Sequence, residues 1–202
     1  MNIKEYFGDI DIYLFDQIMK DRFAPKSRIL DAGCGGGRNL VYFLRNNFEV
    51  YGIDQNENAV SYVRNLAKNI SPKLSEGNFQ VAPVEKIPFP NEIFDLVISS
   101  AVLHFADNEQ HFHQMFDEMW RVLKPNGILF ARLASDIGLK DKVKLVANRR
   151  YLLPDGSERF LVSEELLIDK TEEVQGNLLE PIKTTNVQNL RCMTTWVLGK
   201  KA

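Results

Sequence analysis

The sequence has few cysteines, little net charge and no long hydrophobic run, and each of these shortages excludes a class of protein. Two cysteines, Cys34 and Cys192, occur in 202 residues, which argues against a disulfide framework and indicates a reducing compartment. The formal net charge of −2 provides no general attraction to nucleic acid or anionic membranes. The chain has no apolar run of membrane-spanning length and no apolar signal-peptide core at its start. We therefore expect a soluble, cytoplasmic protein without a membrane partner.

The sequence also lacks internal repeats and low-complexity segments, while 45% of its residues are hydrophobic. That share is enough for a buried core, and the length is close to that of one ordinary domain. Strand-like and helix-like segments alternate along the chain, with apolar runs that end at Asp31 and Asp54 and a third run over 94–100. Alternation of this kind predicts an α/β fold, in which helices cover both faces of a doubly wound, mostly parallel sheet.

Both ends of the chain depart from this alternation. Residues 10–23 predict an additional amphipathic helix before the first strand. The tail over 178–201 contains two extended stretches joined at NVQN, which predicts a C-terminal hairpin. The segment 135–161 is polar, basic and weakly periodic, so we expect a functional loop or a lid there.

The most informative stretch is ILDAGCGGGRNL (29–40), where an apolar strand runs into a glycine-rich turn. Such a turn allows the backbone to approach a ligand closely. A dinucleotide-binding turn ends its glycine pattern where this chain has Arg38. Asp31 would also repel a diphosphate, at a cost of several kcal/mol in a partly buried site. The turn therefore predicts a nucleoside ligand that carries positive charge and no phosphate.

Asp54 adds a second requirement for the ligand. It ends the second strand about 20 residues after the turn, where an acid hydrogen-bonds ribose hydroxyls. An adenosine with a positively charged amino-acid tail satisfies both requirements, and S-adenosylmethionine is that molecule.

Four ordered motifs give the chain a specific resemblance to the class I S-adenosylmethionine-dependent methyltransferases. ILDAGCGGGRN resembles the first motif of the family, VYGID the second, VEKIPFPNEIFDLVISSAVLHF the segment through the fourth strand, and LKPNGILF the fifth-strand turn. GCGGGRN also resembles, more weakly, a small-molecule branch that includes tellurite-resistance enzymes. The resemblance implies a Rossmann-like, seven-stranded sheet with an antiparallel C-terminal hairpin. The expected divisions of a single domain (1–202) are an N-terminal helical segment or lid (1–24), a cofactor-binding core (25–135), a substrate-side insert (136–175) and the hairpin (176–202).

The resemblance implies roles in binding S-adenosylmethionine for ten residues. These are Asp31, Gly33, Cys34, Gly35, Arg38, Asp54, Gln55, Val84, Glu85 and Ser99. The glycine turn and Ser99 should face the methionine and sugar, Asp31 a positive charge, and Asp54 the ribose. Asp31 has a turn-stabilising role as its alternative, and Asp54 a helix-capping role that is compatible with ribose binding. Cys34 is expected to pack beside the ligand rather than react.

Two positions make the cofactor site unusual. Many relatives have an acid where this chain has Pro83, which offers neither a side-chain acceptor nor an N–H. The adenine must then be recognised by the Val84 N–H together with Glu85, a carbonyl or water. Arg38 opposes the helix dipole, so we expect it to pair with the cofactor carboxylate or with a core acid such as Asp31.

A general base is needed only if the methyl acceptor carries a proton at pH 7. His104 follows the fourth strand and is the candidate, with a hydrogen-bonded structural histidine as the alternative. His111 and His113 are expected to face solvent and do not form a zinc motif, so no metal is expected. Tyr6, Phe7 and Tyr13 either form a lid or pack in the core. The basic insert either attracts an anionic substrate or is simply solvated.

These features predict an enzyme that methylates a small molecule. A non-catalytic module that binds S-adenosylmethionine is the main alternative, and an RNA methyltransferase is less favoured because the chain is small and slightly negative. A nicotinamide-dependent oxidoreductase is disfavoured by Asp31 and Arg38.

Overall fold

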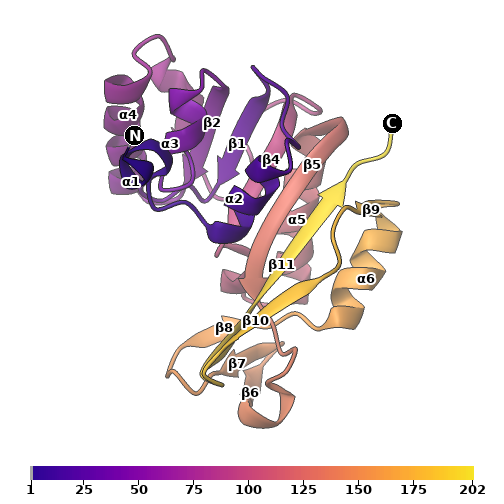
Figure 1. Cartoon of the computed structure of the whole chain (residues 1–202). Coiled ribbons are helices and arrows are strands. Elements are labelled where there is room, and N and C mark those ends of the chain that lie inside the picture. Colours follow the sequence, from indigo (N-terminus) through magenta and orange to yellow (C-terminus); the bar gives the residue numbers. More distant parts are fainter. Residues whose placement is uncertain (1) are drawn as a thin grey trace.

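The computed structural model describes residues 2–202, and Met1, the first residue of the expected N-terminal segment, lies outside them. A mixed β-sheet forms the centre of the molecule (Figure 1). Its strands are β1 (Arg28–Ala32), β2 (Glu49–Asp54), β3 (Phe79–Val81), β4 (Phe94–Ser100), β5 (Leu123–Ala134), β9 (Asn177–Leu178), β10 (Lys183–Val187) and β11 (Arg191–Gly199). Their order is β10-β11-β5-β4-β1-β2-β3, and the two-residue strand β9 also pairs with β11. The expected seven strands form this path, and β9 is an addition to it.

Within residues 2–202, six helices accompany the sheet. They are α1 (Ile3–Phe7), α2 (Ile12–Met19), α3 (Val41–Arg45), α4 (Glu57–Ile70), α5 (Glu109–Val122) and α6 (Glu164–Glu173). Short 3-10 helices occur at Glu76–Asn78, Leu103–Phe105 and Lys140–Lys142. Helix α4 begins at its N-cap Asn56, whose side chain accepts from the Asn58 N–H, and Asn108 caps α5 through the His111 N–H. Polar caps of this type satisfy backbone donors that the first turn of a helix leaves free.

Two hydrophobic cores cover opposite faces of the sheet. One contains Phe43 on α3 and Val63 on α4, together with Leu14 of α2. The other contains Phe116 of α5 and Trp196 of β11, whose rings stack with centroids 5.1 Å apart. Helices α3 and α4 accordingly lie on one side of the sheet and α5 on the other (Figure 1). The strands between them are apolar on both faces, as the sequence predicts for a doubly wound sheet.

The order of the strands reverses at β1. Strand β1 pairs in parallel with β2 on one side and with β4 on the other, so that Asp31 lies opposite Gly52 and Ile98. Ligands of open α/β sheets bind in the crevice outside the carboxyl ends of the strands at such a reversal. The glycine turn leaves β1 at this point, which places Asp31 and Asp54 at the same edge.

The C-terminal hairpin forms as predicted. Strands β10 and β11 pair antiparallel from Lys183 opposite Thr195 to Val187 opposite Arg191, and β11 pairs antiparallel with β5. The segment 135–161, expected to be a functional loop or a lid, combines irregular stretches with short strands that the sequence did not predict. It contains β6 (Lys144–Ala147), β7 (Arg150–Leu152) and β8 (Glu158–Phe160), which make a separate antiparallel sheet.

Helix α1 packs against α3, and α2 contacts β10. The Phe7 ring stacks on Tyr42 at 5.3 Å between centroids, and the Tyr6 hydroxyl donates to Asn46 Oδ1 at 2.8 Å. Tyr13 forms a hydroxyl–hydroxyl hydrogen bond with Thr185 of β10. These contacts correspond to the core-packing alternative for Tyr6, Phe7 and Tyr13.

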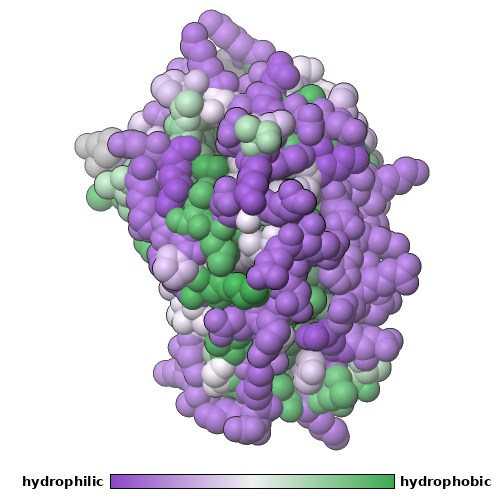
Figure 2. Space-filling model, turned by 90° about the vertical axis from the view of Figure 1, so that its right-hand side faces the viewer, coloured by the Kyte–Doolittle hydropathy of each residue, from purple (hydrophilic) through white to green (hydrophobic). Residues whose placement is uncertain are grey.

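The outer surface is predominantly polar. Figure 2 shows one face that is mostly hydrophilic, with hydrophobic side chains gathered in a band near its middle. Within residues 2–202, no helix combines the length and apolar character needed to cross a bilayer.

Candidate cofactor and acceptor site

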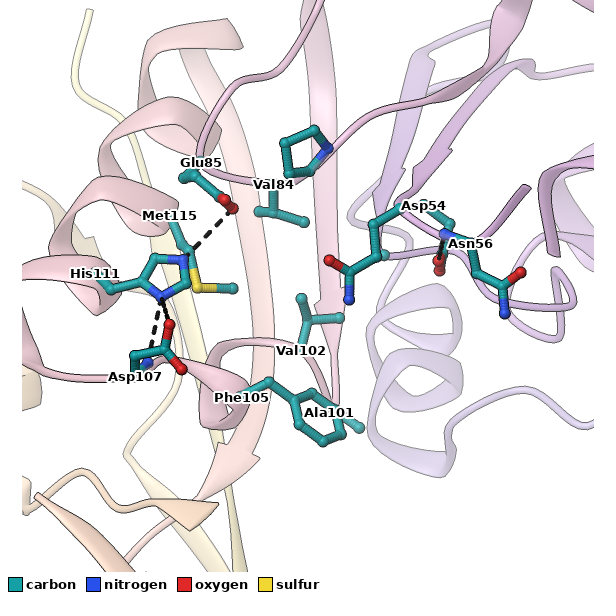
Figure 3. A pocket seen from close by; sticks show the side chains of 13 residues that line it. Asp54, Asn56, Val84, Glu85, Ala101, Val102, Phe105, Asp107, His111 and Met115 are labelled. Carbon is teal, nitrogen blue, oxygen red and sulfur yellow. Dashed lines mark hydrogen bonds and ion pairs between the residues drawn. The ribbon is translucent and has the colours of Figure 1, made fainter. Parts of the chain in front are cut away.

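A cavity of about 480 Å³ opens at the carboxyl ends of β1, β2 and β4. It is lined by Gly33, Asp54, Gln55, Asn56, Pro83, Val84, Glu85, Ala101, Val102, Phe105, Asp107, His111 and Met115. Figure 3 shows polar side chains from the end of β2 on one side and side chains of α5 on the other, with Val102 between them. We call this the first cavity.

The glycine turn is fixed by hydrogen bonds to the end of β2. The N–H groups of Gly33 and Cys34 both donate to the Ile53 carbonyl, at 2.9 and 2.8 Å. Gly33 has φ +84°, and a Cβ added there would lie 2.5 Å from Val102 Cγ2. Both the backbone conformation and the close approach therefore require glycine. The result is a bare backbone surface facing the first cavity.

Asp54 connects the turn to the first cavity. Its Oδ2 accepts from the Gly35 N–H at 2.9 Å, and its Oδ1 accepts from the Asn56 N–H at 2.9 Å. The capping residue of α4 is Asn56, so Asp54 does not have the capping role given as its alternative. Each carboxylate oxygen keeps a further acceptor site, which is available to a hydroxyl in the first cavity.

Asp31 is a buried carboxylate with little support from the protein. Its side chain is 1% exposed, and within residues 2–202 its Oδ1 has no hydrogen-bond partner. Burial raises the pKa of Asp31 to about 7, with Arg38 opposing the rise and Asp54 adding to it. The turn-stabilising alternative is not supported, because a turn acid would accept from backbone N–H groups. An unpartnered buried carboxylate is costly and fits a cationic ligand group such as those of S-adenosylmethionine.

Two further residues of the predicted set lie at this edge of the sheet but do not line the first cavity. Ser99 is 1% exposed, and its Oγ has no partner within the described chain. Cys34 is 5% exposed, and desolvation raises the pKa of its thiol above the ordinary value. A thiol that resists ionisation is a poor nucleophile, which agrees with packing as the role of Cys34.

The opposite wall of the first cavity contains an ionisable group that the sequence analysis misplaced. His111 was expected to face solvent, but its side chain is only 23% exposed and lines the cavity. Its Nδ1 accepts from the Asp107 N–H at 3.2 Å, and its Nε2 lies 3.5 Å from Glu85 Oε2 (Figure 3). The contact with Asp107 in the loop before α5 orients this imidazole toward the cavity. His111 in turn holds the carboxylate of Glu85, which is therefore not available to a ligand without this contact.

Arg38 lies beside a core acid, as one of its two alternatives expects, but this acid is Asp11 and not Asp31. Its Nη2 donates to Ser100 Oγ at 2.9 Å and lies 3.7 Å from Asp11 Oδ2. Asp11 is 3% exposed and also contacts Arg132 Nη1 at 3.2 Å. Asp11 thus ties the N-terminal segment to the ends of β4 and β5. The side chain of Arg38 is still 47% exposed.

A second cavity of about 500 Å³ lies beside the first and shares Ala101 with it. It is lined by Ala101, His104, Arg132, Ala134, Leu153, Asp155, Ser157, Arg159, Val187, Arg191 and Met193. Ala101 has φ +64°, a left-handed conformation that non-glycine residues seldom adopt and that is often found at functional sites. We call this the second cavity.

His104 belongs to the second cavity. Its Nδ1 accepts from the buried Ala134 N–H at 3.2 Å, so the proton of the neutral imidazole is on Nε2. Burial, and secondarily the charge of Arg159, lower the pKa of His104 to about 4. The imidazole is neutral at pH 7 with its lone pair engaged, which makes His104 a hydrogen-bond donor toward the cavity. The geometry favours the structural alternative over the general-base role.

We expect His104 to make the folded protein acid-sensitive. Because its folded pKa of about 4 lies below the ordinary 6.5, the unfolded chain binds the proton first, and stability falls as the pH decreases from 6.5 to 4. The full difference corresponds to about 3 kcal/mol. Urea unfolding at pH 7.5 and 4.5 should show that the free energy of unfolding decreases more in the wild type than in His104→Asn. His113→Asn is the control, because His113 lies on α5 outside both cavities, although at 30% exposure it is partly buried and does not simply face solvent as the sequence predicts. Equal losses in wild type and His104→Asn would contradict the assignment.

Five of the ten predicted cofactor residues line the first cavity. They are Gly33, Asp54, Gln55, Val84 and Glu85. Sequence reasoning missed the apolar walls formed by Val102, Phe105 and Met115. The sequence contains one indication of this wall: His111 and Met115 are four residues apart on a predicted helix, which places both side chains on the same face.

Several known proteins resemble this chain. A family model described as Methyltransferase domain matches residues 30–131. The malonyl-[acyl-carrier protein] O-methyltransferase of Enterobacter lignolyticus is 34% identical over 116 residues, 57% of this chain and 41% of the relative. The ubiquinone/menaquinone biosynthesis C-methyltransferase of Geobacter sulfurreducens is 32% identical over 110 residues, covering 52% of this chain and 41% of the relative. The chain spans less than half the length of both relatives.

Solved structures share the fold. An S-adenosylmethionine-dependent methyltransferase from Methanosarcina mazei aligns with a TM-score of 0.69 at 18% identity, over 91% of this chain and 97% of the other. The 1,6-didemethyltoxoflavin-N1-methyltransferase of Burkholderia thailandensis, solved with bound 1,6-didemethyltoxoflavin and S-adenosylhomocysteine, aligns with a TM-score of 0.70 at 15% identity, over 100% and 82% of the two chains. The weaker resemblance to tellurite-resistance enzymes stays a prediction.

Proposed function

Since this chain belongs to the methyltransferase domain family, and within it to the class I S-adenosylmethionine-dependent methyltransferases, we propose that it transfers a methyl group to a small-molecule acceptor. The observation that carries the proposal is the buried carboxylate of Asp31, whose Oδ1 has no partner in the described chain and which stands two residues before Gly33 of the first cavity. A buried anion without donors favours a cationic ligand, and no phosphate ligand would suit it.

Different residues around the first cavity contact different parts of the cofactor. Asp54 accepts from the ribose hydroxyls while it holds Gly35. Asp31 and the orphaned Ser99 hydroxyl lie on the methionine side. Val84 and the positioned Glu85 lie on the adenine side, where Pro83 offers no donor. When bound, S-adenosylmethionine supplies an electrophilic methyl group on a sulfonium, a leaving group that needs no further activation.

The protein then has to align the acceptor and exclude water. Ala101 borders both cavities, so an acceptor in the second cavity reaches the first across this residue. Phe105 also lines the first cavity, and its ring keeps that boundary apolar. His104 offers Nε2–H as a donor to the acceptor and does not remove a proton. An in-line displacement on an acceptor atom that is already nucleophilic fits this arrangement.

The named relatives do not identify the acceptor atom. By their names, the Enterobacter relative is an O-methyltransferase, the Geobacter relative a C-methyltransferase and the Burkholderia structure an N1-methyltransferase. One fold thus accommodates different nucleophiles, and the acceptor of this chain must be inferred from its own second cavity.

The proposal makes a direct prediction about ligands. Isothermal titration calorimetry should show binding of S-adenosylmethionine and S-adenosylhomocysteine and none of NAD, because Asp31 disfavours a diphosphate. A screen of thiols, amines, phenols and oxyanions should release S-adenosylhomocysteine with at least one class. Binding without turnover would support the non-catalytic alternative, whereas NAD binding in place of S-adenosylmethionine would refute the proposal.

A further inference from the structure

The second cavity contains more positive charge than its own carboxylates neutralise. Three arginines line it, Arg132, Arg159 and Arg191, against a single acid, Asp155. They come from three parts of the chain: β5, β8 of the insert, and β11. The charges therefore meet only in the folded structure.

Two of the three arginines already have carboxylate partners. Arg132 Nη1 lies 3.2 Å from Asp11 Oδ2, and Arg191 Nη1 lies 3.5 Å from Asp155 Oδ2. Asp155 is engaged further, because its Oδ1 accepts from the Ser157 hydroxyl at 2.6 Å and from the Ser157 N–H at 3.0 Å. Arg191 and Asp155 neutralise each other, whereas Arg132 shares the carboxylate of Asp11 with Arg38 and is only partly neutralised.

Arg159 is different. Within residues 2–202 it forms no ion pair, and its Nη1 donates only to the carbonyl of Glu158, at 2.7 Å. Its guanidinium lies 4.9 Å from the centroid of the Phe105 ring, which holds it in place by a cation–π contact. Phe105 lines the first cavity and Arg159 the second. An uncompensated positive charge is therefore fixed at the boundary between the two cavities.

His104 adds a donor at the same place. Its ring packs against that of Phe105 with centroids 4.6 Å apart, and its Nε2–H has no acceptor among the described residues. Leu153, Val187 and Met193 supply apolar surface elsewhere in the second cavity. The cavity thus combines a cation, a neutral donor and an apolar wall.

We propose that the second cavity binds the methyl acceptor through a carboxylate group, which pairs with the Arg159 guanidinium and accepts from His104 Nε2–H. This proposal rests on the proposed function, because it names the acceptor class of that site. Guanidinium and carboxylate match in shape and charge. Arg159 is the arginine of this cavity without a carboxylate partner in the described chain, and its one charge matches a carboxylate better than a phosphate monoester, whose charge at pH 7 is about −1.5 to −2. The apolar surface receives the rest of the acceptor.

The test measures binding of simple anions to the protein saturated with S-adenosylhomocysteine. Isothermal titration calorimetry would use benzoate, phenylacetate and octanoate as carboxylates, benzamide as the neutral counterpart, and phenyl phosphate as the phosphate. We expect at least one carboxylate to bind, and benzamide to bind at least about tenfold more weakly than benzoate. Arg159→Gln should weaken carboxylate binding by about tenfold or more, since a hydrogen bond to a charged group contributes that much.

Lys144→Gln is the matched control. It removes the same charge from an exposed position on β6, outside the second cavity, and should leave carboxylate binding unchanged. Arg159→Gln should bind S-adenosylhomocysteine as the wild type does, which also shows that it is folded. Arg159→Lys should recover part of the carboxylate affinity.

Each other outcome overturns the proposal. The carboxylate assignment fails if no carboxylate binds, if Arg159→Gln behaves as Lys144→Gln does, or if phenyl phosphate binds more tightly with the same dependence on Arg159. In these cases S-adenosylhomocysteine still binds, and the proposed function stands. Failure of the wild type to bind S-adenosylhomocysteine would overturn both.

Discussion

Asp31→Asn is expected to stabilise the unliganded protein at pH 8 and to weaken its binding of S-adenosylmethionine. The pKa of Asp31 is raised from 3.8 to about 7 in the folded state. Between these values the folded state holds a proton that the unfolded chain has released, so stability falls as the pH rises through 7. The difference corresponds to about 4 kcal/mol. Asparagine does not titrate. The free energy of unfolding of the variant, measured with urea, should therefore not show this decrease between pH 4 and 8.

Cofactor binding should show the opposite dependence on pH. A cationic ligand favours the ionised form of Asp31, so binding releases a proton, and affinity for S-adenosylmethionine should rise as the pH increases through 7. Calorimetry in two buffers of different ionisation enthalpy would measure this proton release. Asp31→Asn should bind at least about tenfold more weakly at pH 8, and its affinity should vary little with pH.

Asp136→Asn is the matched control for this prediction. Asp136 also has a buried Oδ1 without a partner in the described chain, and its pKa is raised mainly by desolvation. It does not line the first cavity, so its replacement should alter the pH dependence of stability and leave cofactor affinity unchanged. A wild-type affinity that is independent of pH would contradict the role given to Asp31.

The sequence could predict those parts of the site that follow directly from strand ends. Asp31 and Asp54 end neighbouring parallel strands, and the intervening turn is short, so the chain itself brings them to one edge of the sheet. The hairpin was predictable for a similar reason, because a short polar turn joins two extended segments. In both cases the determining contacts are close in sequence or fixed by strand order.

The rest of the site depends on packing between distant segments. His111 faces the first cavity only because the loop before α5 turns it toward Glu85, 26 positions earlier in the chain. Arg159 reaches Phe105 because the insert folds into a small sheet whose strands are three or four residues long. Strands so short show little periodicity, and the sequence therefore suggested a loop. The basic character of the insert was visible, but which of its cations lacked a partner was not.

Asp54→Ala should reduce the affinity for S-adenosylhomocysteine by about 30-fold or more, equivalent to about 2 kcal/mol, because charge-assisted hydrogen bonds to the ribose are lost. The alanine also frees the Gly35 and Asn56 N–H groups that the carboxylate now holds at 2.9 Å, which loosens the glycine turn. Asp54→Asn retains one acceptor oxygen and should fall between alanine and wild type. Calorimetry measures all three proteins.

Adenosine, which has the ribose but no charged tail, separates the roles of the two acids. If Asp54 binds the ribose, Asp54→Ala should weaken the binding of adenosine and of S-adenosylhomocysteine by similar factors. If Asp31 faces the cationic tail, Asp31→Asn should weaken the binding of S-adenosylmethionine and leave the affinity for adenosine unchanged. Loss of adenosine affinity in both variants would indicate a general collapse of the turn, and circular dichroism would detect the accompanying change in fold. An unchanged dissociation constant for adenosine in folded Asp54→Ala would rule out the ribose contact, because no other acid lines the first cavity on that side of the described chain (Figure 3).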